Sequence, residues 1–548
     1  MELTPFQTHP DRYRHWRLSF DGDRARLEMN VQPDGGMREG YELKLNSYDL
    51  GVDIELADAL SRILFEHPEV RVCVITGTED RVFCAGANIH MLSTSTHAFK
   101  VNFCKYTNET RLYLEDASEH SNKRFLAALN GTASGGGYEL ALACDKILLV
   151  DDRNSAVSFP ELPLLGVLPG TGGLTRIADK RKIRRDRNDV FSCVAEGIKG
   201  KRAVEWNLVD RIAPLSRWDE AVSEMAGEMA DELPTSDAVG IELAPTPFTV
   251  EGNALRYEYV TLELDHAART AELTIRIPDE AGPSDGAAAH AAGSDWWVLR
   301  AFRELDDAIL HLRFDLPQIG LVTTRVVGNS AVVAATDALL ATDDHWFVRE
   351  TRNLVRRVLK RYENSAKSLY AIIDGGTAFT GCFLELALAG DRTYVLNDPD
   401  TPVHLGVTAA NAGMYPMANG LSRLETRFLG TPEAVAPVLA HRLDRGGEVI
   451  DAETADELGL ATFAPDELDW EDELRLAIEE RACFSPDSLT GMEQNIRFAG
   501  PETMETKIFG RLSAWQNWIF QRPNAVGPNG ALKCYGTPRR PEFNYDRT

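Results

Sequence analysis

The chain has 548 residues, 58 of them Lys or Arg and 84 Asp or Glu, giving a formal charge of −26. This length predicts two or three domains, and 44% hydrophobic with 26% charged residues is typical of a folded globular protein. The acidity excludes a surface that broadly attracts nucleic acid, so a phosphate-bearing ligand needs local cations or backbone N–H groups. No apolar run approaches the roughly 20 residues of a membrane span, and residues 1–30 lack the apolar core of a signal peptide. We expect a cytoplasmic protein with no membrane partner.

In chain order, the first half alternates strands with helices. The patterns predict strands at 26–31, 70–76, 125–129 and 147–150, and helices at 54–65 and 139–144. Because these strands are apolar on both faces, the expected layout is α/β with a buried sheet. The eight cysteines contain no Cys-x-x-Cys pair and several lie in apolar runs, which favours reduced, buried thiols. No His and Cys spacing suggests a metal.

The second half repeats the first. Residues 125–145 and 369–391 share one pattern, with an offset of 245 residues from Gly131 to Gly376 and 246 from Asp145 to Asp391. The strand patterns at 26–31 and 272–277 show a similar offset. We therefore predict two tandem α/β domains of one fold, the second degenerate, followed by a helical C-terminal region.

The predicted domains are 1–245, 246–470 and 471–548. Residues 280–294, rich in Gly and Ala, are expected to form a mobile loop within the second copy. The tail 535–548 either wraps over a neighbour or is disordered.

Three segments of the first copy can carry chemistry. Gly135-Gly136-Gly137 follows a strand and opens a helix, so a free backbone N–H lies beside Glu139 on the same helix face. Phe83–Ile89 follows another strand, where Gly86 permits a tight turn, Asn88 is a suitable N-cap and the Ala87 N–H is exposed. Two converging N–H groups form an oxyanion hole, which suits a thioester carbonyl becoming an enolate.

A second carboxylate is Glu161, in Ser158-Phe159-Pro160-Glu161. Two glutamates at one thioester could deprotonate water and return a proton. Taken alone, each of these three segments is more often a packing turn or a loop end. The glycines fit neither a Gly-x-Gly-x-x-Gly nor a Gly-Lys-Ser/Thr template, so nucleotide binding of those kinds is not expected.

In their order and spacing, these motifs closely resemble the crotonase (enoyl-CoA hydratase/isomerase) superfamily. The resemblance is strong over 20–215 and weak over 255–465, and it implies tandem crotonase-like domains built as a ββα spiral. It implies that Ala87 and Gly136 donate the oxyanion-hole N–H groups, that Glu139 and Glu161 are catalytic, and that an acyl-CoA thioester is bound. The implied substrate-binding residues are Ala85, Gly86, Asn88 and Gly135, where Asn88 replaces the family's common Asp. The resemblance implies no metal and no cofactor, because CoA is part of the substrate.

The second copy is eroded. It keeps Glu385, but only Gly381 remains of the glycine run, and Asp400 falls where Glu161 is expected. A structural or dimerisation role fits these losses better than a second CoA site, which stays the alternative.

A crotonase domain followed by a degenerate copy and a tail resembles the benzoyl-CoA-dihydrodiol lyase family. That resemblance implies ring opening of 2,3-epoxybenzoyl-CoA with water, releasing formate and 3,4-dehydroadipyl-CoA semialdehyde in aerobic benzoate degradation. It also implies a homo-oligomer, with a dimer favoured. The alternatives are an enoyl-CoA hydratase or isomerase acting on another acyl-CoA, and a non-catalytic acyl-CoA-binding protein. The basic stretch 180–187 could contact CoA phosphates, but a solvated helix face is the favoured interpretation.

Overall fold

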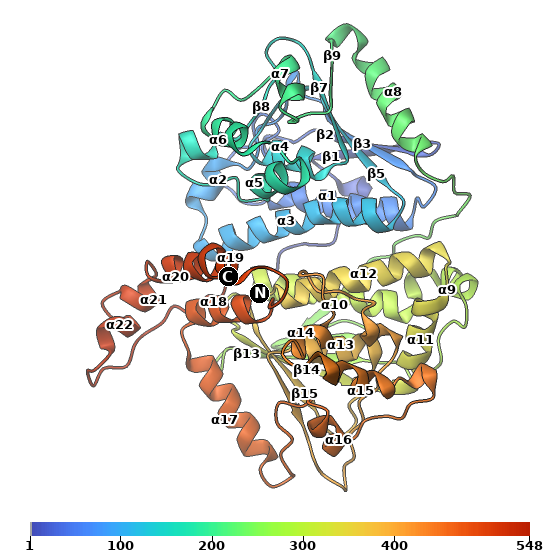
Figure 1. Cartoon of the computed structure of the whole chain (residues 1–548), viewed down its shortest axis with the longest axis vertical. Helices are drawn as coiled ribbons and strands as arrows, with labels where there is room; N and C mark the ends of the chain where they lie inside the picture. The colour runs from blue at the N-terminus through green and yellow to red at the C-terminus, as the bar shows by residue number, and fades with distance from the viewer. Residues whose placement is uncertain (1–2) are drawn as a thin grey trace. The chain divides into compact units, whose positions relative to one another are not determined.

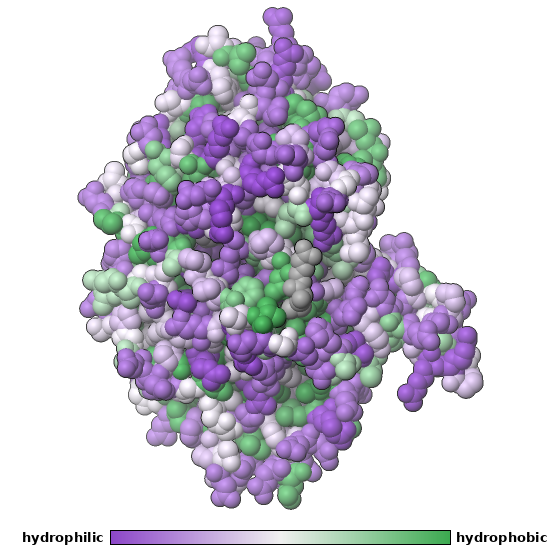
Figure 2. Space-filling view, turned by 180° about the vertical axis from the view of Figure 1, so that it is seen from behind, coloured by the Kyte–Doolittle hydropathy of each residue, from purple (hydrophilic) through white to green (hydrophobic). Residues whose placement is uncertain are grey.

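The computed structural model describes residues 3–548, which divide into two compact units (Figure 1). The N-terminal unit is Pro5–Leu243, and the C-terminal unit is Ala244–Thr548 together with the segment up to Thr4. All eight cysteines are free thiols. No helix in residues 3–548 is long and apolar enough to cross a membrane. Figure 2 shows hydrophilic residues over most of the face that it presents.

The N-terminal unit contains two sheets whose strands alternate along the chain. Its larger sheet has the order β1 (Trp16–Asp21), β2 (Arg24–Met29), β3 (Val72–Gly77), β5 (Arg124–Leu129), β7 (Lys146–Val150) and β9 (Arg211–Ala213). The smaller sheet has the order β4 (Arg81–Cys84), β6 (Gly131–Ser134) and β8 (Val157–Ser158). The helices are α1 (Leu50–Phe65), α2 (Ile89–Thr94), α3 (His97–His120), α4 (Gly136–Ala143), α5 (Gly173–Thr175), α6 (Arg185–Cys193), α7 (Gly200–Glu205) and α8 (Trp218–Asp231).

Successive strands step from the larger sheet to the smaller one before each helix. β3 leads to β4 and then α2, and β5 leads to β6 and then α4. All pairs from β2 to β9 in the larger sheet are parallel. Because the carboxyl ends of parallel strands lie at one edge, the loops before α2 and α4 are brought together. The α/β layout with a buried, mostly parallel sheet that the sequence predicts for the N-terminal half is confirmed.

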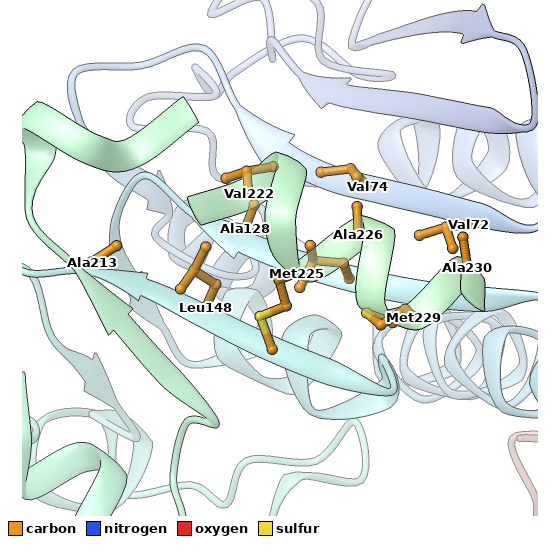
Figure 3. Packing of buried hydrophobic residues seen from close by; sticks show 11 residues of the cluster. Val72, Val74, Ala128, Leu148, Ala213, Val222, Met225, Ala226, Met229 and Ala230 are labelled. Atoms are coloured by element: carbon orange, nitrogen blue, oxygen red, sulfur yellow. The ribbon is translucent and has the colours of Figure 1, made fainter. Parts of the chain in front are cut away.

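The core between the larger sheet and α8 is built from small and flexible apolar side chains (Figure 3). On α8, the buried positions 222, 225, 226, 229 and 230 follow the spacing of one helical face. They pack against Val72, Val74, Leu126, Ala128, Leu148 and Ala213 of the sheet. The neighbouring sheet residue Cys73, which points to the opposite face, is also buried. The sheet is therefore covered on both faces, as its continuous apolar strands predict.

The C-terminal unit has one seven-stranded sheet and many helices. The strand order is β10 (Thr249–Glu251), β11 (Ala254–Arg256), β12 (Val260–Asp265), β13 (Thr270–Arg276), β14 (Leu321–Val327), β15 (Ser368–Ile373) and β16 (Arg392–Val395). The longer helices are α9 (Gly286–Ala292), α10 (Trp297–Phe314), α11 (Ser330–Thr342), α12 (Trp346–Glu363), α13 (Gly381–Ala389), α17 (Trp470–Cys483), α18 (Pro486–Ile496) and α20 (Ser513–Ile519). The short helices are α14 (Arg423–Arg427), α15 (Val435–Ala440), α16 (Ala452–Glu457), α19 (Met504–Thr506), α21 (Pro523–Val526) and α22 (Ala531–Cys534).

The two larger sheets share a pairing sequence. In each, an antiparallel hairpin (β1–β2 or β12–β13) continues into parallel strands. The smaller sheet has no counterpart among the named strands of the C-terminal unit in residues 244–548, where only isolated bridges such as Thr380 to Gly406 occur.

The sequence-based prediction for 280–294 was wrong. This segment contains α9 and a 3₁₀ turn at Gly293–Asp295, with Asp285 as the N-cap of α9 accepting from the Ala288 N–H at 2.8 Å. Its alanines are strong helix formers, and they outweigh the flanking Gly and Pro once a cap is present.

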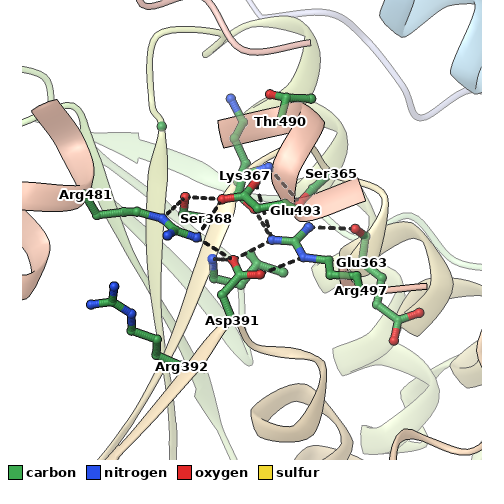
Figure 4. A network of polar contacts seen from close by, with 12 residues as sticks. Glu363, Ser365, Lys367, Ser368, Asp391, Arg392, Arg481, Thr490, Glu493 and Arg497 are labelled. Atoms are coloured by element: carbon green, nitrogen blue, oxygen red, sulfur yellow. Dashed lines mark hydrogen bonds and ion pairs between the residues drawn. The ribbon is translucent and has the colours of Figure 1, made fainter. Parts of the chain in front are cut away.

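Buried ion pairs tie the C-terminal helices to β15 and β16 (Figure 4). Arg497, just after α18, binds Asp391 with two hydrogen bonds of 2.9 and 2.6 Å. Arg481 of α17 binds Glu493 at 3.0 Å and the Ser368 hydroxyl at 2.9 Å. Because a buried charge left alone is costly, each of these partners depends on the others.

The tail also joins this region. The Arg547 guanidinium binds Glu493 and, at 3.1 Å, the Thr490 hydroxyl, and Arg547 is 2% exposed. Thr4 binds Asp315 of the same unit through its N–H at 3.1 Å and its hydroxyl at 2.6 Å. Residues from both ends of the described chain are therefore fixed in the C-terminal unit.

Shortening a side chain in the N-terminal core tests this packing. Leu148→Ala removes a side chain of 0% exposure and is expected to lower the free energy of unfolding by about 2–5 kcal/mol. Leu215→Ala, at a side chain of 69% exposure, is the matched control and should change it by less than about 0.5 kcal/mol. Urea denaturation measures the free energy of unfolding of both variants, and hydrogen exchange of peptides from β5 and β7 reports whether the loss is in this core. Equal effects would contradict the described core.

Candidate active site

Asn88 shapes the loop between β4 and α2. It is the N-cap of α2, as predicted, and its Oδ1 accepts from the Met91 N–H at 2.9 Å. Its Nδ2 donates to the Glu42 carbonyl at 2.7 Å and lies 3.2 Å from the Ser47 hydroxyl. The polar atoms of this side chain are therefore used within the loop.

Tyr48 sets the direction of the Ala87 N–H. The Tyr48 N–H donates to the Gly86 carbonyl at 3.0 Å, and its carbonyl accepts from the Asn88 N–H at 2.9 Å. In a parallel bridge of this kind, the N–H and C=O of the intervening residue face away from the partner strand. The Ala87 N–H is thus directed away from Tyr48. The preceding residue Ala85 donates to the Leu45 carbonyl at 3.0 Å, which anchors the loop.

The second donor lies at the start of α4. Gly135, with φ +52°, precedes the helix, and its carbonyl accepts from the N–H groups of Tyr138 and Glu139, both at 2.9 Å. The Gly136 N–H belongs to the first turn, which has no acceptor inside the helix. Because the positive end of the α4 dipole also lies at this N-terminus, this end of the helix favours an anion.

The two donor loops touch at their glycines. A Cβ on Gly86 would lie 2.9 Å from the Gly136 nitrogen, and a Cβ on Gly136 would lie 2.0 Å from the Tyr48 hydroxyl oxygen. Only glycine fits at both positions, and this contact brings the Ala87 and Gly136 loops to one place.

Glu139 is held by donors on the following loop. Its Oε1 accepts from the N–H groups of Thr171 at 2.9 Å and Gly173 at 2.7 Å, and its Oε2 accepts from the Thr171 hydroxyl. The loop Gly170-Thr171-Gly172-Gly173 therefore positions the glutamate. Glu139 is 2% exposed, and all three of these groups donate hydrogen bonds to it. Such a site suits a carboxylate, which only accepts hydrogen bonds.

Glu161 has the opposite environment. It begins a π-helical turn, Glu161–Leu165, and a Cβ on Gly135 would lie 2.4 Å from its Oε1. Its Oε2 is buried and has no hydrogen-bond partner within residues 3–548. Burial, together with the charge of Glu139, raises the pKa of Glu161 to about 7. The two glutamates are thus distinguished by their surroundings.

Three further residues near the site were not identified from the sequence. Arg111 of α3 donates to the Tyr48 hydroxyl at 3.2 Å and to the Gly136 carbonyl at 3.3 Å. Cys104, also on α3, is close enough to Glu139 that this charge, after burial, raises the pKa of its thiol to about 11. Single Tyr, Arg and Cys residues without a motif carry no signal in one sequence.

The start of α13 in the C-terminal unit resembles that of α4. Gly381 has φ +50° and stands four residues before Glu385, just as Gly135, with φ +52°, stands four residues before Glu139. Gly381 therefore corresponds to Gly135. Cys382 occupies the position of the Gly136 donor.

Part of the basic stretch 180–187 is not a solvated face. The Arg181 guanidinium is 9% exposed and binds Asp210 at 2.9 Å, and Lys180 binds Glu115 at 2.9 Å. These two cations are therefore paired with acidic residues of the same unit. Within residues 3–548, no group of three His, Cys, Asp or Glu side chains is placed to hold a metal ion.

Comparison with known proteins agrees with this geometry. The enoyl-CoA hydratase/isomerase family matches residues 42–244. A benzoyl-CoA-dihydrodiol lyase of Aromatoleum evansii is 53% identical over 100% of this chain and 98% of its own length. The chain belongs to the benzoyl-CoA-dihydrodiol lyase family of the crotonase superfamily. It is an enzyme of the lyase class.

Other relatives match a smaller share of the chain. A 2,3-dehydroadipyl-CoA hydratase of Escherichia coli K12 is 33% identical over 30% of this chain and 60% of its own. A solved enoyl-CoA hydratase structure from Geobacillus kaustophilus HTA426 is 30% identical and covers 40% of this chain and 75% of that chain, with a TM-score of 0.35.

Adding a methyl group at the second donor tests the crotonase-type site. Gly136→Ala would push the Tyr48 hydroxyl or the donor amide aside, and we expect turnover to fall by about 10²-fold. The control is Gly227→Ala on α8, where the nearest atom to the new Cβ is the Arg24 guanidinium at 3.5 Å. Initial rates with the acyl-CoA substrate measure both. A folded Gly136→Ala enzyme with the wild-type rate would contradict the assigned donor.

Proposed function

We propose that the enzyme opens the ring of 2,3-epoxybenzoyl-CoA with water, releasing formate and 3,4-dehydroadipyl-CoA semialdehyde, in aerobic benzoate degradation. The observation that carries the proposal is the pair of glutamates with unlike environments beside two aligned backbone donors. Full-length similarity to a benzoyl-CoA-dihydrodiol lyase supports the choice of an aromatic-derived CoA thioester over a fatty acyl one.

The mechanism assigns separate roles to the two donors and the two carboxylates. The Ala87 and Gly136 N–H groups bind the thioester oxygen and stabilise charge that develops there. Glu139, held by its three donors, is the base that takes a proton from water. Glu161, whose pKa of about 7 keeps much of it protonated near neutral pH, is the acid that returns a proton to the opening ring. The steps are the addition of two water molecules, proton transfers, and the cleavage of one ring carbon–carbon bond that releases formate. Together they involve no net oxidation or reduction, so no redox cofactor is needed.

The thioester itself is expected to bind through backbone groups around Ala85, Gly86 and Gly135. The Asn88 side chain is used in capping α2, so we propose that its part in substrate binding is to hold this loop.

The C-terminal unit is proposed to be a non-catalytic copy of the crotonase fold. The Cys382 N–H donates to Asp337 at 2.9 Å, so an internal carboxylate occupies the position that a thioester oxygen would need. Glu385 is paired with the Arg423 guanidinium at 2.7 Å and also accepts from Asn411 at 2.7 Å, so a buried cation compensates its charge, whereas the donors to Glu139 are uncharged N–H and hydroxyl groups. All these side chains are buried.

The chain is further proposed to act as a homo-oligomer, with a dimer favoured, in the cytoplasm. Exposed apolar residues directly after Glu161, including Leu164 at 68% and Leu168 at 63%, support a surface that is covered by substrate or by a second chain. Domain limits at 245 and 470 stay predictions.

Removing one charge at each of the two equivalent glutamates tests the proposed catalytic unit. Glu139→Gln should leave the fold intact and lower formate release from 2,3-epoxybenzoyl-CoA by about 10²-fold or more. Glu385→Gln, at the corresponding place in the C-terminal unit, should leave the rate of folded enzyme unchanged.

Mass spectrometry of the products, with crotonyl-CoA as the alternative substrate, measures both variants and separates the rival activities. Hydration of crotonyl-CoA without formate release from the epoxide would establish an enoyl-CoA hydratase instead. Tight thioester binding without turnover of either compound would establish a binding protein.

The pH dependence of the rate tests the role of Glu161. Because the acid form is the active one, kcat/KM should fall as the pH rises through about 7. Glu161→Gln should be slower throughout and lose this alkaline limb. Rate profiles between pH 5.5 and 9 on wild type and variant provide the measurement. A rate that rises through this range would reverse the assignment of acid and base.

A further inference from the structure

Arg111 is a fully buried cation with no part in the mechanism described so far. It lies on α3 and is 1% exposed, and its two terminal nitrogens contact different parts of the N-terminal unit. Nη1 binds Asp53 of α1 at 3.0 Å, whose other oxygen accepts from the Thr107 hydroxyl at 2.5 Å. Nη2 donates to the Tyr48 hydroxyl at 3.2 Å and to the Gly136 carbonyl at 3.3 Å.

Tyr48 contacts both donor loops. Its backbone brackets Ala87 through hydrogen bonds with Gly86 and Asn88. Its hydroxyl lies against Gly136, so closely that a Cβ there would be 2.0 Å away. Moving the Tyr48 side chain would therefore alter the placement of the Gly136 donor relative to that of Ala87.

The need for such a support follows from the glycines. Gly86 and Gly136 allow the loops to approach, but residues without a Cβ have little conformational preference of their own. The backbone hydrogen bonds of Tyr48 restrain the Ala87 loop, and the bond from Arg111 restrains the carbonyl of Gly136, next to the donor amide. An oxyanion hole works only when its donors are already in position before charge develops.

Charge favours the same arrangement. Burying a guanidinium is costly unless it is paired. Both terminal nitrogens of Arg111 have partners, whereas its buried Nε has none within residues 3–548. Asp53 pairs with the end of Arg111 that faces α1, while the other end is turned toward the loops that would receive negative charge. The charges of Asp53 and Glu139 are among the causes that raise the pKa of Arg111, so the cation is retained across the working pH range.

We propose that Arg111 and Tyr48 form a brace that holds the Ala87 and Gly136 N–H groups in position for the thioester oxygen. Both are positioning residues, because they act through the donor loops and not on the substrate. The inference rests on the proposed function of these two amides.

The experiment compares two ligands that differ only at the carbonyl: benzoyl-CoA, a thioester, and S-benzyl-CoA, the corresponding thioether. The ratio of their dissociation constants, measured by isothermal titration calorimetry, isolates the contribution of the oxyanion hole. Tyr48→Phe keeps the ring and backbone and removes only the hydroxyl. The double variant Arg111→Met with Asp53→Asn removes the cation without leaving its carboxylate unpaired. Tyr13→Phe is the matched control, since its hydroxyl donates to Asp58 at 2.5 Å, outside the donor loops.

Wild type and Tyr13→Phe should prefer the thioester, and the preference should fall by about tenfold in Tyr48→Phe and at least as much in the double variant. The infrared carbonyl band of bound benzoyl-CoA should lie at lower frequency in wild type and return toward its free position in both brace variants. A merely structural role would lower the melting temperature without changing the ratio or the band.

The outcomes distinguish a failure of the proposed oxyanion hole from a failure of the proposed brace. If wild type itself shows no preference for the thioester, the proposed oxyanion hole is wrong. If wild type shows the preference and folded Tyr48→Phe retains it in full, the brace is wrong. If the double variant does not fold, Tyr48→Phe together with Arg111→Lys, which keeps the charge but not the forked geometry, decides the question.

Discussion

The close contact between Gly86 and the amide of Gly136 is the constraint on which the proposed active site depends. Two loops from successive turns of the fold can place their N–H groups side by side only if no side chain stands between them. The parallel sheet supplies the first condition, by bringing both loops to one edge. The glycines supply the second, and the buried residues behind them, Tyr48 and Arg111, limit the freedom that glycine introduces.

The environments of the carboxylates follow from the same geometry. Glu139 projects from α4 toward a loop of N–H and hydroxyl donors, whereas Glu161 starts a turn that leaves one of its oxygens buried without a donor. One position favours an acceptor and the other favours a proton, so a pair of identical residue types can divide acid and base chemistry between them. In the C-terminal unit, which we propose to be a copy of this fold, Glu385 faces Arg423 and the Cys382 amide faces Asp337, so both groups are used within a closed polar core.

Much of the N-terminal unit could be predicted from the sequence, because its signals are local. Apolar runs marked β3, β5 and β7, Asn88 marked the start of α2, and the glycine run marked the start of α4. The order of these motifs indicated the family. What could not be predicted depends on contacts between distant residues. Arg111 reaches Gly136 across 25 positions and Tyr48 across 63, and no pattern within one sequence reports such pairs. The roles proposed for Glu139 and Glu161 depend on how each carboxyl group is buried and hydrogen-bonded, which the sequence does not report. The helix α9 was missed because its cap, Asp285, lies among residues typical of a loop.

The way the C-terminal unit is closed has a consequence for how the protein is made. Thr4 bonds to Asp315, 311 residues later, and Arg547 reaches Gly320 across 227 residues, whereas Pro5–Leu243 forms a compact unit of its own. The N-terminal unit is in effect inserted into the other one near its start. Pairings over such long separations form slowly, because the chain loses more entropy before they are gained. Pro5–Leu243 can therefore reach its fold early, whereas the segment at Thr4 gains its contact with Asp315 only once the later part of the chain is present. The segment that comes first in the chain is thus among the last to be fixed in place.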